Sequence, residues 1–169
     1  MIFTPLQNYK INKAQKKNSG IRRSIAYKEA SYFGIIFHNN EQAKIDAAEK
    51  LSTLLKMDNK KVKNIAYEHK SAIKHLPYDT LTKENFDFFG GLSGKNALDF
   101  TSAEFDFLIC LDNEPNGSVR CILANSKAKC RVGKYNEVNQ TTYEMLLVDK
   151  TNNYIKWVEE LYHYLKRLS

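Results

Sequence analysis

The chain has 169 residues, of which 43% are hydrophobic and 12% aromatic, and its formal net charge is +7 at pH 7. This composition is typical of a globular domain and argues against a disordered chain. No apolar run reaches the roughly 18 residues of a membrane span, and the N-terminus lacks the apolar stretch of a secretory signal. The three cysteines, Cys110, Cys121 and Cys130, have no CxxC spacing, so we expect reduced thiols and a cytoplasmic location.

The positive charge is concentrated near the N-terminus. Residues 1–30 contain one acidic side chain, Glu29, and seven basic ones: Lys10, Lys13, Lys16, Lys17, Arg22, Arg23 and Lys28. The whole chain has 26 basic and 19 acidic residues, so 19 basic and 18 acidic ones remain for residues 31–169. We therefore predict a basic N-terminal arm over residues 1–30 and a nearly neutral domain over residues 31–169.

A helix is predicted within the arm. Pro5 is favoured at the first helical position, and Gly20 is a suitable stop. On such a helix Lys10, Lys13 and Lys17 share one face. Because the arm offers few apolar residues to a core, we expect its removal to leave the thermal stability of the domain nearly unchanged.

Strands and helices alternate in the first part of the domain. The apolar patterns predict a strand over residues 32–37, a helix over about 41–56 and a strand over 62–67. Asn39 or Asn40 is expected to cap the helix. The pattern then weakens into a long connection over residues 68–95, with a short helix and a short strand near Ala97 and Leu98 expected.

The second part begins with the most informative stretch of the chain, residues 105–133. It predicts an apolar strand over 105–111, a helix over about 118–127 and a short strand over 131–133. A final strand over 143–148 precedes a C-terminal helix, which Asp149 or Thr151 is expected to cap. This alternation predicts a single α/β domain with an open, mostly parallel, Rossmann-like sheet and helices on both faces.

Two candidate site residues stand at the ends of predicted strands. His38 follows the first strand, and Asp112 ends the strand over 105–111. Because parallel strands end at the same edge of a sheet, these side chains are predicted to face each other there. A carboxylate in this place can act as a general base, although an aspartate also ends strands merely as a good turn former.

The usual nucleotide-binding signatures are missing from the chain. The first strand is followed by His38-Asn39-Asn40-Glu41, without the glycine turn that lets backbone amides approach pyrophosphate. There is no Walker motif, and the loop GGLSGK over residues 90–95 resembles only half of a phosphate cradle. The histidines and cysteines lack metal-ligand spacing. We expect no cofactor and no metal.

These motifs carry two resemblances. The stretch FDFLICLD…ILANSKAKCRVG resembles a strand, helix and strand in the N-terminal half of heptosyltransferase-type (family 9) glycosyltransferases, which implies a shared fold. The basic arm, the GIIF strand, FFG, EFDFLICL, SKAKCRVG and the amphipathic C-terminal helix are together similar to a family of small uncharacterised bacterial proteins, a domain of unknown function. That resemblance implies the architecture and a cytoplasmic location, but no reaction.

From these observations we expect a cytosolic, non-catalytic binding module whose basic arm contacts an anionic partner, with RNA or a ribosome as first candidate. The lysines and arginines of the arm would neutralise phosphates, and Tyr9 and Tyr27 would stack on bases. The alternative is an enzyme of unknown reaction, a glycosyltransferase-like half domain, that uses Asp112 and His38. A third option is attachment of the arm to a membrane surface, for which its apolar face is small.

Overall fold

Parallel strands form one six-stranded sheet in the described part of the chain, in the order β3-β2-β1-β4-β5-β6. The computed structural model describes residues 5–68, 76–87 and 91–169. The strands are β1 (Tyr32–His38), β2 (Lys61–Tyr67), β3 (Thr80–Leu81), β4 (Phe107–Cys110), β5 (Cys130–Lys134) and β6 (Met145–Leu147). The helices are α1 (Pro5–Asn18), α2 (Gln42–Met57), α3 (Lys95–Ser102), α4 (Gly117–Asn125) and α5 (Tyr154–Lys166), and the 3-10 turns are η1 (Ser19–Ile21), η2 (Lys83–Asn85) and η3 (Glu137–Asn139).

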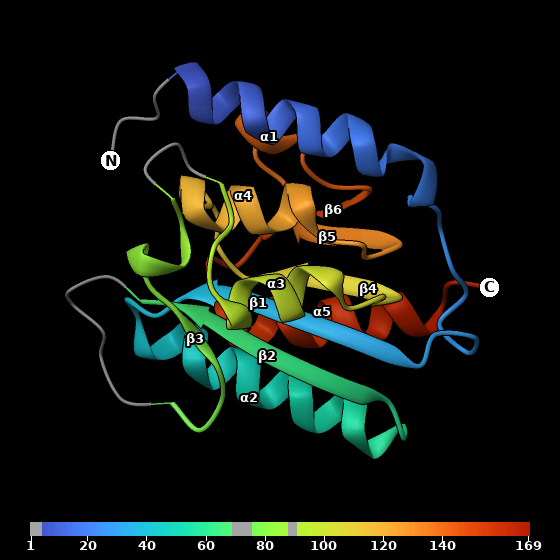
Figure 1. The fold of residues 1–169 in the computed structure, drawn as a ribbon. Coiled ribbons are helices and arrows are strands. Elements are labelled where there is room, and N and C mark those ends of the chain that lie inside the picture. Colours follow the sequence, from blue (N-terminus) through green and yellow to red (C-terminus); the bar gives the residue numbers. More distant parts are fainter. Residues whose placement is uncertain (1–4, 69–75, 88–90) are drawn as a thin grey trace.

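Helices cover both faces of the sheet, as predicted. Helices α2 and α5 pack against each other and against one face, while α3 and α4 lie on the opposite face (Figure 1). Helix α1 lies on the outer side of α4 and forms an additional layer there (Figure 1). The predicted fold class, a Rossmann-like α/β domain, is therefore confirmed.

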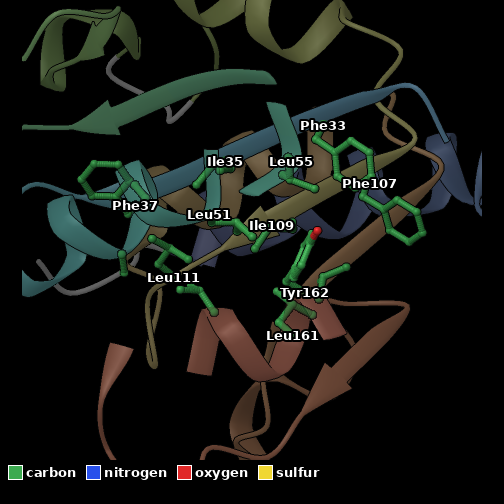
Figure 2. Packing of buried hydrophobic residues seen from close by; sticks show 14 of the residues in the cluster. Phe33, Ile35, Phe37, Leu51, Leu55, Phe107, Ile109, Leu111, Leu161 and Tyr162 are labelled. Atoms are coloured by element: carbon green, nitrogen blue, oxygen red, sulfur yellow. The ribbon is translucent and has the colours of Figure 1, made fainter. Parts of the chain in front are cut away.

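The central strands are apolar on both of their faces. In β1, Phe33 and Ile35 belong to the core on the α2–α5 side, whereas Ile36 belongs to the core on the α3–α4 side. Successive side chains of a strand point to opposite faces, so a strand covered on both faces needs a continuous apolar run. Figure 2 shows one of these cores, with Phe33, Ile35, Phe37, Phe107, Ile109 and Leu111 of the sheet region beside Leu51, Leu55, Leu161 and Tyr162 of the helices.

The order of the strands reverses between β1 and β4. From β1 the chain passes through α2 to β2 and β3 on one side, and it returns through α3 to β4 on the other side. The carboxyl ends of β1 and β4 therefore form the topological switch point, where open α/β sheets commonly bind ligands. His38 is the last residue of β1, and Asp112 lies two residues beyond the end of β4.

The structure corrects the predicted strand near Ala97 and Leu98, which lie in α3. This helix starts directly after Gly94, whose φ of 83° is in the left-handed region that glycine adopts readily. Ala97, Phe100 and Thr101 are buried at helical spacing. The glycine-rich loop over residues 90–95 thus leads directly into α3, while its first residue, Gly90, lies outside the described residues.

The predicted helix caps were also wrong. Glu41, not Asn39 or Asn40, precedes α2, and it makes no side-chain capping bond. The Asn39 side chain donates to Glu68, and Asn40 Oδ1 accepts from Lys44. Helix α5 is capped by the Asn153 side chain, which accepts a hydrogen bond of 3.1 Å from the amide of Lys156. The two residues that had been expected there, Asp149 and Thr151, form the turn before the helix instead.

The predicted helix of the arm is present, but the arm contributes more to the core than we expected. Helix α1 begins at Pro5, and Gly20 lies in the 3-10 turn that follows its end. Ile11, Tyr27 and Ala30 are buried. Ile11 packs against Cys121 and Ala124 of α4, which attaches α1 to the domain.

Candidate functional site

Asp112 and His38 meet at the switch point, although not through their two side chains. The Asp112 Oδ2 atom accepts a hydrogen bond of 3.0 Å from the backbone amide of His38. The His38 imidazole lies instead against the Tyr67 ring, with 5.5 Å between ring centroids. The two residues are therefore in contact at this edge through the His38 backbone, whereas the predicted facing of the two side chains is not found, because the imidazole lies against β2.

The second partner of Asp112 is a buried lysine that the sequence analysis missed. The Lys44 Nζ atom lies 2.6 Å from Asp112 Oδ1, and the two side chains are only 6% and 4% exposed. Lys44 also donates to Asn40 Oδ1 at 2.9 Å and lies 3.4 Å from Glu41. Burial lowers the pKa of Lys44, but the charge of Asp112 and its hydrogen bond outweigh this effect, so the pKa is raised and the ammonium group persists.

A second buried lysine lies at the end of β5. The Lys134 Nζ atom lies 2.7 Å from Asp149 Oδ2 and 3.9 Å from the centre of the Tyr154 ring. The same ring lies 5.8 Å from Lys44 Nζ. Burial raises the pKa of Asp149, but the hydrogen bonds from Lys134 and from the Thr151 amide together lower it by more. The pKa of Asp149 therefore lies below its ordinary value.

These groups form what we call the carboxyl-edge cluster: Lys44, Asp112, Lys134, Asp149 and Tyr154. Each buried ammonium group is matched by a carboxylate, and the tyrosine ring lies near both lysines. The ion pair of Asp112 lies at the carboxyl ends of β1 and β4, the place where dinucleotide-binding sheets receive their ligand. In the described residues, no group of three histidine, cysteine, aspartate or glutamate side chains is arranged to hold a metal ion.

One sequence signal could have revealed Lys44. It lies on the buried stripe of α2, at helical spacing from Ala48, Leu51 and Leu55. A lysine on an apolar stripe is rarely buried without a partner, so this position points to a carboxylate elsewhere in the chain. No comparable pattern marks Lys134, because β5 is too short for its alternation to be informative.

The basic side chains of α1 lie on its exposed face. Ile11 is buried against α4, and the helical period of 3.6 residues places Tyr9, Lys13 and Lys16 on the opposite side, with Lys17 beside them. All four are exposed, and Tyr9 is 63% exposed. We call these four residues the α1 face.

Lys10 lies on the same side of α1 as Lys13 and Lys17, as their spacing of three and seven residues predicts. It is left out of the α1 face because its Nζ atom lies 3.6 Å from an Asp87 carboxylate oxygen, which offsets its charge. The exposed residues Arg23 and Lys28 follow α1, on the segment that leads to β1. The basic residues of the arm are thus divided between the helix and this segment.

Arg22 differs from the other basic residues of the arm because its guanidinium group is engaged by the domain. It donates to the carbonyl of Ser126 at 2.7 Å and to the carbonyl of Ala128, and its Nε atom lies 3.9 Å from Glu144. Burial, with the nearby charge of Arg131, lowers the pKa of Arg22 to about 10. Tyr27 is buried as well, so Tyr9 is the arm tyrosine whose ring is accessible for stacking.

The fold and the carboxyl-edge cluster define a class: a small Rossmann-like α/β protein whose switch point is occupied by its own ion pair. Residues 5–168 match a family of unknown function (DUF6913), and the chain belongs to this family. This confirms the resemblance to an uncharacterised family.

A solved structure with a similar fold is that of the Escherichia coli heptosyltransferase WaaC with ADP. The TM-score is 0.51 and the sequence identity 8%, over 80% of this chain and 48% of that chain. The chain thus spans about half the length of that enzyme, in its N-terminal half, which confirms the fold-level resemblance. No curated protein sequence matches the chain significantly. A helix long and apolar enough to cross a membrane does not occur in the described ranges.

Proposed function

We propose that this protein binds single-stranded RNA in the cytoplasm through the α1 face, and that the Rossmann-like domain carries this face without catalysing a reaction. The observation that carries the proposal is the exposed ring of Tyr9 among Lys13, Lys16 and Lys17. Lysines neutralise phosphates, and an aromatic ring stacks on the unpaired bases of a single strand. RNA in a ribosome would offer the same chemistry.

The attachment of α1 supports this role. Ile11 fixes the orientation of the helix on α4, and the Asn18 side chain donates a hydrogen bond of 3.0 Å to the carbonyl of Ala124. These contacts hold the helix in one orientation, with the α1 face toward solvent. Helix α1 contains no acidic residue, so no carboxylate on the helix itself opposes a phosphate.

The carboxyl-edge cluster supports the non-catalytic part of the proposal. Asp112 is in contact with Lys44 and with the amide of His38, so its charge is compensated within the protein. A ligand that bound between the carboxyl ends of β1 and β4 would have to break this buried ion pair, at a cost of several kcal/mol.

RNA binding is tested by measuring the affinity for a fluorescent oligouridine at several salt concentrations. Changing Lys13, Lys16 and Lys17 to alanine should weaken binding at low salt and reduce the slope of log K against log[salt] by about 2, because three phosphate contacts are lost. Alanine favours helix, so α1 should remain folded. The control changes three exposed lysines elsewhere, Lys56, Lys150 and Lys156, and should retain the wild-type slope.

Tyr9 provides a test that does not depend on charge. Tyr9→Ala should reduce the affinity about 5- to 100-fold with an unchanged salt slope, because stacking contributes about 1–3 kcal/mol per base. Tyr9→Phe should bind like the wild type. Equal binding to single-stranded DNA or to ribosomes would widen the ligand class, whereas no binding to RNA at low salt would overturn the proposal.

A second candidate function is an enzyme that uses Asp112 and His38, which their position at the topological switch point favours. A screen of nucleotides, sugar nucleotides and phosphorylated metabolites would detect a ligand by its shift of the melting temperature. The comparison variant, Lys44→Met with Asp112→Leu, removes both charges while keeping the volume. A ligand that stabilises the wild type but not this variant would favour the enzyme over the RNA-binding module.

A further inference from the structure

Two concavities lie side by side at the amino edge of the sheet, and Arg23 lines both of them. One has a volume of about 280 Å³ and includes Tyr164, Met145 and Leu168 in its wall. The other has a volume of about 210 Å³ and includes Lys127. Neither contains a residue of the carboxyl-edge cluster, which lies at the opposite ends of the strands.

The α1 face leads directly to these concavities. After Lys17 the chain forms η1, and Ile21 at its end lines the second concavity. The Arg23 amide then donates a hydrogen bond of 2.9 Å to the carbonyl of Lys129, just before β5. Figure 1 shows the chain descending from the end of α1 along this edge of the sheet, near the C-terminus.

The second concavity has the charge that a phosphate requires. Its charged residues are Arg23, Lys127, Lys129 and Glu104. Lys129 is engaged by Asp106 at 2.7 Å. Arg23 and Lys127 are exposed, and within the described ranges neither side chain makes a hydrogen bond or ion pair. These two cations are therefore available to an anionic ligand.

The first concavity has the walls that a nucleobase requires. Tyr164 is 45% exposed, so part of its ring is open to solvent. Met145 and Leu168 add apolar surface. The carboxylate there, Glu144, is neutralised by Arg131, whose Nη2 lies at 2.6 Å and whose backbone amide donates at 2.8 Å. Its charge therefore opposes a phosphate in the neighbouring concavity only weakly.

From this arrangement we infer that the nucleic-acid surface extends beyond the α1 face to a nucleotide site at the amino edge. A base of the bound strand lies against Tyr164 in the first concavity, and a phosphate lies between Arg23 and Lys127 in the second. This inference rests on the proposed function and adds a second contact region for the same strand. The linker after α1 is then part of the binding surface.

The phosphate part is tested with Arg23→Ala combined with Lys127→Ala, using the same oligouridine. The slope of log K against log[salt] should fall by about 0.7, because the two cations that hold one phosphate are removed. Combining these changes with the α1-face variant should add the two losses, since the sites do not share partners. The control, Lys56→Ala with Lys150→Ala, should bind like the wild type.

The base part is tested with Tyr164→Ala, which should weaken binding about 5- to 100-fold at an unchanged salt slope. Tyr164→Phe should restore the affinity, because its ring still stacks. Thermal unfolding of each variant shows whether the fold is retained, and Tyr164→Phe remains informative if the alanine variant is unstable.

The outcomes separate this inference from the proposed function. If the α1-face variant loses affinity while the Arg23/Lys127 and Tyr164 variants bind like the wild type, the amino-edge site is wrong and the proposed function stands. If both sets lose affinity as expected, the extended surface is supported. If the wild-type protein does not bind RNA, both proposals are overturned.

Discussion

The hydroxyl of Tyr27 donates a hydrogen bond of 2.7 Å to Asp58 Oδ2, which joins the last part of the arm to the end of α2. The same oxygen accepts a hydrogen bond of 2.8 Å from Tyr162 of α5, and Lys166 lies 3.1 Å away. The arm is therefore bonded to both helices on one face of the sheet. Its first part is attached on the other face, through Ile11.

We expect the two parts of the arm to contribute unequally to stability. Removing residues 1–20 loses the packing of Ile11 and should lower the melting temperature modestly. Removing residues 1–29 also loses the hydrogen bonds of Arg22 and the buried ring of Tyr27. This should lower the free energy of unfolding by a further amount of about 2–4 kcal/mol. Thermal and urea unfolding of the two truncated chains measure this difference. Equal stability of the two would contradict the structural role of residues 21–29.

Asp58 should make stability dependent on pH in the acidic range. Hydrogen bonds from Tyr27 and Tyr162, and from Lys166, hold the pKa of Asp58 below its ordinary value, against a smaller opposing effect of burial. A depressed folded-state pKa stabilises the protein above the unfolded-state pKa of about 3.9, and this contribution is lost as the pH falls through the folded-state value.

Asp58→Asn should therefore be less stable than the wild type at pH 7, and the difference should shrink as the pH falls below about 4. Urea unfolding at pH 7, 5 and 3 measures it. Asp99→Asn, at an exposed position on α3, is the matched control and should stay close to the wild type throughout. A difference for Asp58→Asn that is constant over this range would show that the charge of Asp58 is not involved.

The elements that the sequence predicted well are those whose apolar pattern is unambiguous. Residues 105–133 correspond to β4, α4 and β5, because a strand covered on both faces needs a continuous apolar run. The pattern failed for α3, since three glycines precede this short helix and its apolar positions are few. The two-residue strand β3 is too short to leave a signal.

The candidate site was predictable only in part. Asp112 and His38 could be placed at one edge, because parallel strands end together. The apolar stripe of α2 could have indicated that Lys44 is buried, but not which carboxylate pairs with it, since Asp112 lies 68 residues away in the chain. Arg22 shows the same difficulty, because a count of charges does not tell which guanidinium group turns toward the domain.

The ion pair of Lys44 and Asp112 should be costly to break on one side. Asp112→Asn leaves a buried ammonium group without its counter-charge and should destabilise the protein by about 3–5 kcal/mol. Lys44→Met with Asp112→Leu removes both charges and should cost much less than the sum of the single changes. Urea unfolding of Lys44→Met, of Asp112→Leu and of the double variant forms the double-mutant cycle.

The matched control for this cycle is the exposed pair of Lys50 and Glu159. Their charged atoms lie 3.1 Å apart, and the side chains are 43% and 41% exposed. Glu159→Gln should cost less than about 1 kcal/mol, because water screens the exposed charge. An equally small cost for Asp112→Asn would mean that Lys44 finds water or another partner when Asp112 is changed.

Gly133 should not tolerate even one additional methyl group. It lies in β5 beneath the buried ring of Tyr143, and a Cβ atom at this position would lie 2.5–2.7 Å from three ring atoms. Because backbone and ring are both fixed by packing, Gly133→Ala should destabilise the protein by about 1–3 kcal/mol.

Gly20→Ala is the control, since no atom lies within 4 Å of the added group. When Tyr143 is already changed to leucine, the further change Gly133→Ala should cost less stability than it does in the wild type, as expected for residues in contact. If the melting temperatures of Gly133→Ala and Gly20→Ala are equal, the Tyr143 ring moves freely and is not a fixed part of the core.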